Sequence, residues 1–396
     1  MSIFSGLFKK NSERVLLINI GSASVVGALV STEDVSSTIT ATVTTEMAAH
    51  ADTDLAQFER EMEKALAGTL ASLAKLRLHS PDRVIVYFAA PWYASQVRMA
   101  KMSRPAPFVV SKSLLTDMIS RELKAFEAEE LSGANSGTEQ LRAIESKTVQ
   151  VKLNGYPSND PVGLSARELE LSIFLSVAPE RTLGKIEEII THEYHRPVAF
   201  SSFLSASFIV ARDFFPHQDN YLLIDVGGEV TDVTLVREGA IVQSLSFPLA
   251  RNFILRTLST TLGRSISESL ALCTLYVEDK LEPSIKDACT NALTQAKDKW
   301  LESFQKTLFS ISNELSIPDT ILLSVGPDIA PWFIETIRRE KFNQYSLTEK
   351  EFKVIVLDVE MFNDALSFAE GVPRNPFIMI EALASAREIA SKNIRS

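Results

Sequence analysis

Two stretches that open alike decide the fold: LLINIGSASVVGALV at residues 16–30 and LLIDVGGEVTDVTLV at residues 222–236. Each is an apolar run, a turn containing glycine and a second run rich in Val, Leu and Thr, which is typical of two antiparallel strands joined by a turn. The copies are offset by 206 residues, and each opens one half of the chain. One such hairpin would be common, but two in equivalent places indicate an internal duplication.

The second turn carries the residues that suit anion binding. Gly227 and Gly228 lack a Cβ, so their amides form a concave set of donors that a phosphate can approach closely. Asp225 ends the preceding strand, where a carboxylate can hold the water shell of a Mg²⁺ ion. Thr231 begins the returning strand. A P-loop differs, because its glycine-rich turn leads into a helix and ends in Lys-Ser/Thr, and no such motif occurs in this sequence.

Patterning around the first hairpin predicts an α/β lobe. Alternating Thr and Val at 37–45 predict a third strand, apolar residues at helical spacing predict a helix over 55–78, and the apolar run 83–89 predicts a buried strand. Further helices are expected at 182–194 and 201–214.

Residues 91–177 differ in character and are interpreted as a compact insertion. A basic strand after Pro91, a helix near 113–130 and strands at 148–153 and 168–177 are expected there. Beyond the second hairpin, the pattern predicts a third strand at 240–246, helices at 251–262, 267–275 and 283–315, strands at 321–325 and 353–357, a helix starting near Pro331 between those two strands and a terminal helix.

Composition restricts the function classes. With 45% hydrophobic and 23% charged residues the 396-residue chain is globular, and its net charge of −10 argues against nucleic-acid binding. Two cysteines are too few for a disulfide framework or a thiolate zinc site. His192 and His195 lack the H-E-x-x-H spacing of a zinc helix. No apolar run approaches the roughly 18 residues of a transmembrane helix.

The paired hairpins resemble the actin-like ATPase superfamily, which includes actin, the heat-shock ATPases and sugar kinases. In that family the two hairpins face each other across a cleft and hold the nucleotide phosphates. The resemblance implies ATP and Mg²⁺ as ligands. Its implied phosphate contacts are Gly21, Ser22, Ala23, Ser24, Gly227, Gly228 and Thr231, and its implied Mg²⁺ residues are Asp225 and Asn19.

The insertion resembles one family within this superfamily. LNGYPSNDPVGLSARELELSIFLSV (153–177) is similar to the strand–turn–strand of the subdomain inserted in FtsA proteins of bacterial cell division. The run Asp160-Pro161-Val162-Gly163-Leu164 is its most specific part. PilM proteins of type IV pili share the overall plan and the short basic N-terminal tail, but the DPVGL run favours FtsA. The implied partner-binding residues are Asp160, Pro161, Gly163 and Arg167.

The fold class expected from these resemblances is α/β, a duplicated actin-like (ribonuclease H-like) two-lobe fold with an inserted FtsA-type subdomain. The expected division is a tail (1–13), the first lobe in two parts (14–90 and 179–218), the insertion (91–178), the second lobe (219–358) and a return to the first lobe with a C-terminal helix (359–396).

Two departures from the family pattern concern hydrolysis. Asn19 stands where the family usually carries Asp, and an amide brings no charge to Mg²⁺. Ser201 and Ser202 stand where relatives often carry a Glu-Pro pair near the attacking water, so a general base is expected to be missing.

Two further departures concern the adenosine side. The family motif there is a Gly-Gly turn, of which this chain keeps Gly326, between Val325 and Pro327, as its implied adenosine site. The branched Val325 is expected to narrow the pocket. Ala250 and Arg251 replace another Gly-Gly before a helix. We therefore expect nucleotide binding with weak or absent hydrolysis, so at most a slow ATPase.

The chain ends leave two membrane readings open. The N-terminal MSIFSGLFKK places apolar residues ahead of Lys9 and Lys10, which suits either a short interfacial anchor or a tail packed on the body. The segment 376–396 is expected to be a helix docked on the first lobe, with any membrane attachment shifted to residues 3–10.

The resemblance implies an FtsA-like cytoskeletal adaptor, cytoplasmic and peripheral on the inner face of the membrane. Its implied partners are further copies of the chain and a tubulin-like division protein or the tail of an inner-membrane protein. One alternative is a PilM-like cytoplasmic scaffold of a pilus assembly complex. Another is a small-molecule kinase of the same fold, for which no catalytic Asp can be placed.

Overall fold

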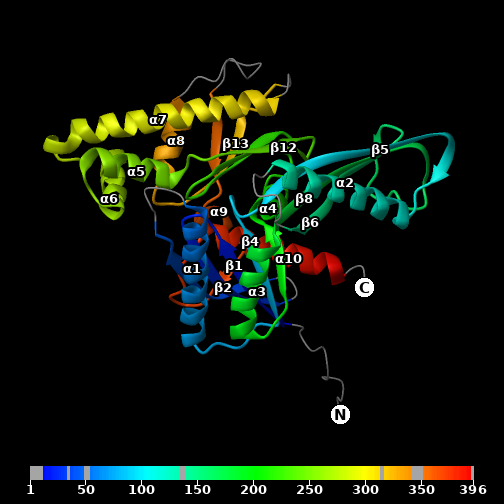
Figure 1. Ribbon diagram of the computed structural model, residues 1–396, viewed down its shortest axis with the longest axis horizontal. Helices are drawn as coiled ribbons and strands as arrows, with labels where there is room; N and C mark the ends of the chain where they lie inside the picture. The colour runs from blue at the N-terminus through cyan, green and yellow to red at the C-terminus, as the bar shows by residue number, and fades with distance from the viewer. Residues whose placement is uncertain are drawn as a thin grey trace, which may run out of the picture.

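The computed structural model describes residues 12–33, 36–48, 54–133, 140–312, 316–339 and 351–393, and Figure 1 labels their helices and strands. The predicted N-terminal anchor lies outside these residues. Three sheets organise the described part of the chain: one in each lobe, and a third that projects sideways.

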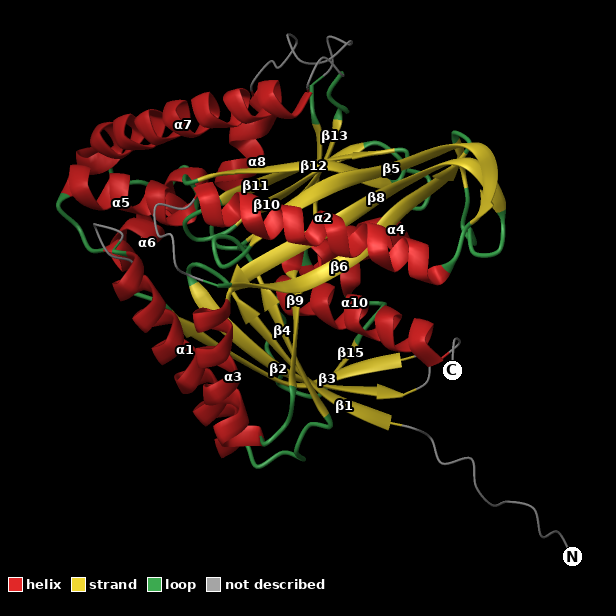
Figure 2. Cartoon of the chain, turned by 45° about the vertical axis from the view of Figure 1, so that its right-hand side comes forward, coloured by secondary structure: helices red, strands yellow, loops and turns green. Residues whose placement is uncertain are grey.

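The first sheet has the order β15-β3-β2-β1-β4-β9. Helices α1 and α3 cover one of its faces, and α4 and α10 cover the other (Figure 2). The bounds of this lobe are β1 Ser12–Ile20, β2 Ser24–Glu33, β3 Ser36–Glu46, α1 Leu55–Lys75, β4 Arg83–Phe88, α3 Glu180–Tyr194, β9 Val198–Ser202, α4 Phe203–Phe214, α9 Val359–Phe362, β15 Ser367–Phe368 and α10 Pro376–Asn393.

The second sheet has the order β12-β11-β10-β13-β14. Helices α5, α7 and α8 pack on the face that lies away from the first lobe. The bounds are β10 Tyr221–Val226, β11 Thr231–Arg237, β12 Ala240–Phe247, α5 Arg251–Leu262, α6 Ile266–Val277, α7 Pro283–Ser312, β13 Thr320–Val325, α8 Ala330–Arg339 and β14 Lys353–Val356.

The duplication extends to the register of the strands. In both sheets the first strand pairs antiparallel with the second and parallel with the fourth, and the fourth pairs parallel with the fifth. Each sheet has an irregularity between its second and third strands, at Leu29/Val30 in one lobe and at Leu235/Val236 in the other. These positions are again 206 residues apart, so the halves share even the local defect of the ladder.

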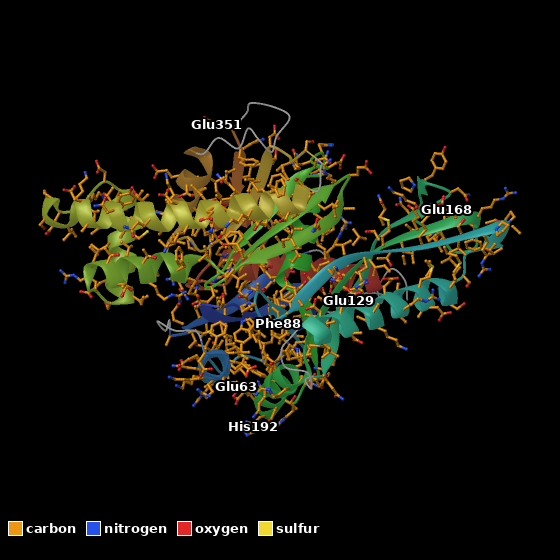
Figure 3. All side chains as sticks on the ribbon, turned by 45° about the horizontal axis from the view of Figure 1, so that its top comes forward. Glu63, Phe88, Glu129, Glu168, His192 and Glu351 are labelled. Carbon is orange, nitrogen blue, oxygen red and sulfur yellow. The ribbon has the colours of Figure 1, made fainter. Side chains whose placement is uncertain are left out.

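The third sheet, β5-β8-β6-β7, is inserted between β4 and α3 and carries α2 on one side. Its outer part reaches well beyond the two lobes, as the position of Glu168 shows (Figure 3). The bounds are β5 Ala94–Val109, α2 Lys112–Gly133, β6 Leu141–Leu153, β7 Tyr156–Pro157 and β8 Ser165–Pro179.

Alternation along the central strands explains how the lobes are joined. In β1, Leu16 and Ile18 pack on α1 and α3, whereas Leu17 packs on α4 and α10. In β10, Leu222 enters the core of the second lobe, and Leu223 joins the same cluster as Leu17. One continuous apolar core therefore crosses the junction of the two sheets. Each fully buried aliphatic side chain in it contributes about 1.5–3 kcal/mol.

Most predicted elements are found, but the prediction lacks the short elements β7, α9 and β15, and two further differences concern β9 and β6. Strand β9 is missing from the prediction, which began a helix at Ser201; the structure ends β9 at Ser202, whose hydroxyl caps α4 by accepting from the amide of Ser205. Strand β6 begins at Leu141, seven residues before the predicted start. Helix α10 packs against β1 and α4 of the first lobe. In the described residues no helix is both long and apolar enough to cross a membrane.

Candidate functional site

The two hairpin turns have matching internal geometry and meet between the lobes. In the first turn the amide of Gly21 donates to the carbonyl of Ser24, and in the second the amide of Gly227 donates to the carbonyl of Val230, both at 3.0 Å. The hydroxyl of Ser22 accepts from the amides of Gly228 and Glu229, both at 2.9 Å. The lobes are therefore hydrogen-bonded to each other through their turns.

The glycine at 228 is required by this contact. A Cβ built there would lie 2.6 Å from the amide nitrogen of Ala23 and 2.7 Å from the Ala23 Cβ. From the sequence, Gly228 was expected to lack a side chain so that a phosphate could approach its amide. In the structure the first turn itself fills the space where a Cβ would lie. The amides keep the concave arrangement of an anion nest, with the Ser22 hydroxyl as their acceptor.

A cleft of about 690 Å³ opens from the two turns, a size suited to a nucleotide. Its walls come from both lobes. Of the residues predicted from sequence to bind phosphate, adenosine or Mg²⁺, the following line it: Asn19, Gly21, Ser22, Ala23, Ser24, Asp225, Gly227, Gly228, Gly326 and Pro327.

Two of the predicted residues do not line this cleft. The hydroxyl of Thr231 is buried in the second lobe, where it donates to the carbonyl of Leu249 at 2.7 Å and accepts from the indole nitrogen of Trp300 at 3.3 Å. Val325 is likewise buried in the core of that lobe. Gly326, the neighbour of Val325, does line the cleft.

Three carboxyl groups, Asp225, Asp232 and Glu381, gather at the base of the cleft, and we call them the floor. The side-chain amide nitrogen of Asn19 donates to Glu381 Oε1 at 2.5 Å, and Glu381 is fully buried. Burial and the nearby Asp225 raise the pKa of Glu381 well above its usual value. Asp225 faces Asp232 across the β10–β11 ladder, and burial with that neighbour raises the pKa of Asp225 as well.

Asp232 completes this floor. Burial raises its pKa to about 6, although the Ser246 hydroxyl, which donates to it at 2.5 Å, acts in the opposite direction. Asp225 keeps part of its surface on the cleft, while its Oδ1 is enclosed and has no hydrogen-bond partner in the described residues. A carboxylate that faces the cleft suits a Mg²⁺ ion brought in by phosphates, because Mg²⁺ takes one or two carboxylates together with water and phosphate oxygens.

The second turn is tied to α5. Glu229 accepts from Asn252 at 2.8 Å and pairs with Arg256 at 2.6 Å, while the amide of Asn252 donates to the carbonyl of Gly228 at 2.8 Å. The orientation of the Gly227–Gly228 amides is therefore fixed from the second lobe, whichever group accepts from them.

The far wall of the cleft combines an apolar slot with an ion pair. Leu255, Ile266 and Leu270 from α5 and α6 line one side. The Arg251 guanidinium pairs with Asp328 at 2.8 Å, two residues beyond Gly326. Glu46 of the first lobe also lines the cleft. Its pKa is raised, mainly by burial and also by Asp328, although the Arg251 guanidinium acts in the opposite direction.

Sequence reasoning missed Glu145, which binds Ser201 and Ser202. Its carboxylate accepts from the hydroxyl of Ser201 at 2.6 Å and from the amide and hydroxyl of Ser202 at 3.1 and 2.5 Å. Lys147 pairs with it at 2.8 Å. These contacts hold β6 of the inserted sheet against β9, and Glu145 is not among the residues that line the cleft.

The residues predicted to bind partners lie at the outer part of the inserted sheet. Asp160, Gly163 and Arg167 are exposed, whereas Pro161 is buried. Gly163 has a φ of +87°, and its amide donates to the carbonyl of Val110 at 2.8 Å, so the turn is held on the end of β5. The nearby Leu164 is 48% exposed.

Among the described residues no group of three or more His, Cys, Asp or Glu is arranged to hold a metal ion. His192 lies exposed near the outer end of α3, away from the cleft (Figure 3).

The sequence matches no protein-family model and no curated protein sequence. Among solved structures, a chain of the PilM–PilN type IV pilus biogenesis complex is similar at a TM-score of 0.61, with 14% identity over 94% of this chain and 98% of that one.

Two other solved structures superpose less well. A Bacteroides thetaiotaomicron protein with an actin-like ATPase fold and unknown function has a TM-score of 0.43, with 9% identity over 96% and 99% of the two chains. The ethanolamine utilization protein EutJ from Carboxydothermus hydrogenoformans has a TM-score of 0.42, with 11% identity over 94% and 88%. The chain has the actin-like ATPase fold, as predicted. At 14% identity the likeness to the PilM–PilN chain establishes the fold alone.

Proposed function

We propose that this chain is a nucleotide-binding adaptor of PilM type, which binds ATP with Mg²⁺ between its lobes and holds the cytoplasmic tail of an inner-membrane protein. The observation that carries the nucleotide part is the meeting of the two turns, Ser22 against Gly228, at a cleft of about 690 Å³. In this proposal the terminal phosphates bind at the turns, and the base enters the slot beside Gly326.

The charges of the cleft support binding of a phosphate chain with its metal. Arg251 supplies a guanidinium on the lining, and guanidinium groups bind phosphate in a bidentate manner. Asp225 would hold the metal, with the Asn19 side chain nearby as a neutral neighbour. Asp225 is the only one of the three floor carboxyl groups that lines the cleft in the described residues.

Slow or absent hydrolysis is part of this proposal. A general base has to reach the attacking water within hydrogen-bond distance. Ser201 and Ser202 take the family position, and Glu145 beside them accepts hydrogen bonds from both and is paired with Lys147. A carboxylate engaged in this way orders the backbone instead of accepting a proton from water.

The adaptor part rests on two features. The similar solved structure is a protein complex, PilM–PilN, and the inserted sheet of the present chain reaches away from the lobes. In this proposal residues 91–178 form a separate subdomain that binds the partner. The chain also associates with further copies of itself.

A second candidate is an FtsA-like adaptor of cell division at the inner membrane surface, in contact with a tubulin-like protein. The Asp160–Leu164 run favours it, because this turn stands exposed at the outer part of the insertion. Asp160 and Arg167 would then be contact residues for a partner or a second copy.

Two measurements test these proposals separately. Thermal unfolding with ATP, with and without Mg²⁺, should show a rise in Tm that is lost in Arg251→Ala. If Tm rises neither with ATP alone nor with ATP and Mg²⁺, the chain does not bind the nucleotide.

Pull-down with the cytoplasmic tail of a pilus inner-membrane component should retain the wild-type chain. Retention by a tubulin-like division protein instead, lost in Asp160→Ala/Arg167→Ala, would favour the FtsA-like candidate.

A further inference from the structure

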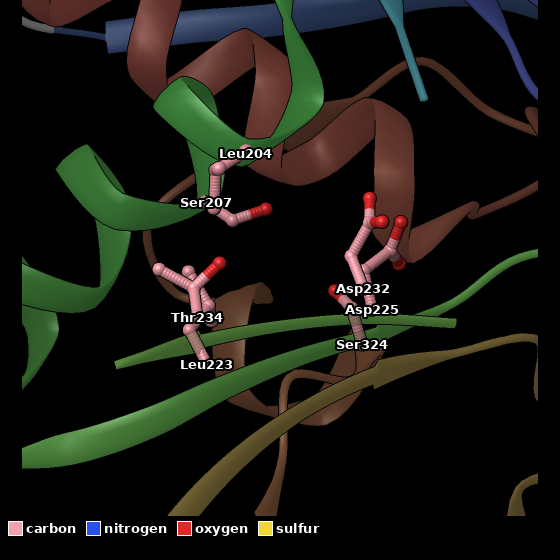
Figure 4. A pocket seen from close by; sticks show the side chains of 7 residues that line it. All are labelled: Leu204, Ser207, Leu223, Asp225, Asp232, Thr234 and Ser324. Carbon is pink, nitrogen blue, oxygen red and sulfur yellow. The ribbon is translucent and has the colours of Figure 1, made fainter. Parts of the chain in front are cut away.

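A small cavity lies beside Asp225 and Asp232, at the junction of α4 with the second sheet. Its volume is about 10 Å³, which is room for one particle of the size of a water molecule. Figure 4 shows Ser207 and Thr234 on one side of the space and Asp225, Asp232 and Ser324 on the other.

Three polar atoms that line this cavity have no partner in the described residues. They are the hydroxyl oxygens of Ser207 and Ser324, whose residues are 2% and 1% exposed, and Asp225 Oδ1. Buried polar groups are nearly always hydrogen-bonded, and an orphaned group costs about 1–3 kcal/mol. Three orphans around one cavity indicate that something occupies it.

The charge of the surroundings identifies the kind of occupant. Asp225 and Asp232 both line the cavity, and Glu381 lies close enough to Asp225 for that carboxyl group to raise the pKa of Glu381. In the described part of the chain no Lys, Arg or His forms an ion pair with any of these three carboxyl groups. Buried charges are normally paired with an opposite charge or with a metal ion.

We propose that this cavity binds a monovalent cation of about the size of a water molecule, K⁺ being the physiological choice, through Ser207 Oγ, Ser324 Oγ and Asp225 Oδ1, with Asp232 as a second carboxylate.

Other occupants satisfy fewer of the observations. A water molecule would satisfy the hydroxyls but would add no charge. A proton on Asp225 would remove a charge but would leave the hydroxyls of Ser207 and Ser324 without partners. Mg²⁺ usually keeps several waters, for which there is no room.

The proposed ion would bridge the lobes. Ser207 lies on α4 of the first lobe, whereas Asp225 and Ser324 lie on β10 and β13 of the second. A cation bound to all three stabilises their junction independently of any nucleotide.

The first test is the Tm of the full chain in KCl and in choline chloride at equal ionic strength, with EDTA and without nucleotide. Because an ion that binds only the folded state raises its stability by mass action, Tm should be at least about 2 °C higher in KCl. The double variant Ser207→Ala/Ser324→Ala should lose this difference. Ser269→Ala, which removes a fully buried helical hydroxyl far from the cavity, should keep it.

The second test uses the wild-type chain and so does not depend on how the variants fold. Crystals soaked in RbCl should show an anomalous peak in the cavity within contact distance of the three proposed ligand atoms. A refined water molecule with no anomalous signal, equal Tm in the two salts, or a KCl effect that persists in the double variant would each overturn the proposal. Because nucleotide is absent throughout, these outcomes are separate from those of the ATP experiment.

Discussion

Ser22 and Gly228 occupy equivalent positions in the two duplicated turns, and they contact each other: the amide of Gly228 donates to the hydroxyl of Ser22 at 2.9 Å. The same duplication that supplies two turns therefore supplies a hydroxyl on one and a glycine on the other. The Ser22 hydroxyl supplies the hydrogen-bond acceptor, and Gly228 leaves the space that a Cβ at that position would take from Ala23.

Replacing Gly228 with Ala should force the turns apart. The new Cβ would lie 2.6 Å from a backbone nitrogen, which cannot move as a flexible side chain would. We expect a lower Tm, a loss of about 1–3 kcal/mol for the two broken hydrogen bonds, and a smaller ATP-induced rise in Tm. Gly184→Ala on α3 is the control, because no atom lies within 4 Å of its new Cβ; it should be neutral or slightly stabilising. Equal effects of the two variants would contradict the role of the contact.

Replacing Asn19 with Asp should reveal the cost of the family carboxylate in this chain. The new charge would face Glu381 and stand near Asp225, and the hydrogen bond from Asn19 would be lost. We expect a Tm lower than that of the wild type without Mg²⁺, and partial recovery with Mg²⁺ and ATP. Asn19→Ala, which removes the donor without adding charge, should be destabilised but insensitive to Mg²⁺. If Mg²⁺ affects both variants alike, residue 19 does not face the metal.

Asp232 should make the fold less stable as the pH rises. Its pKa is about 6 in the folded chain and 3.8 ordinarily, so between about pH 4 and 6 the unfolded chain has released a proton that the folded chain still holds. Stability then falls with rising pH, by at most about 3 kcal/mol for this shift. Asp232→Asn should therefore gain stability relative to the wild type between pH 4 and pH 7. Urea unfolding in choline-based buffers measures this gain, and a relative loss over this range would show that the fold does not raise the pKa of Asp232.

Glu145 should determine how firmly the inserted sheet is held. Glu145→Gln keeps one acceptor but removes the charge that Lys147 and the hydroxyls of Ser201 and Ser202 share. We expect a loss of about 1–3 kcal/mol and faster amide exchange in β6 and β9. Lys101→Ala, which breaks exposed ion pairs on the same sheet, should cost far less stability, because water screens such pairs. Unchanged exchange in β9 would show that the joint does not depend on this carboxylate.

The hairpins, and with them the fold, were readable from sequence because their signal is local. The runs before Gly21 and Gly227 carry both the strand pattern and the turn, and their spacing reveals the duplication. Strand β9 was not readable in this way. It has five residues, follows a proline and runs directly into α4, so its apolar pattern merges with that of the helix.

The chemistry of the floor was only half readable. Asp225 and Asn19 stand in the hairpins, whereas Glu381 comes from a helix far along the chain, and only the fold brings it to Asn19. One signal was present: Glu381 is a charged residue within the apolar run PFIMIEALASA, where a fully buried carboxylate has to find a partner. Glu145 lies on a strand that begins seven residues earlier than its pattern suggested.

The matched irregularities at Leu29/Val30 and Leu235/Val236 give this molecule an internal reference. The two hairpins share strand order, pairing and the register shift between their second and third strands, so any residue in one has a counterpart in nearly the same backbone surroundings. The same substitution made in turn at both counterparts would separate its effect on the hairpin fold, which both share, from its effect on one side of the cleft. Residues 19 and 225 are one such pair of counterparts, with an amide in the first lobe and an acid in the second.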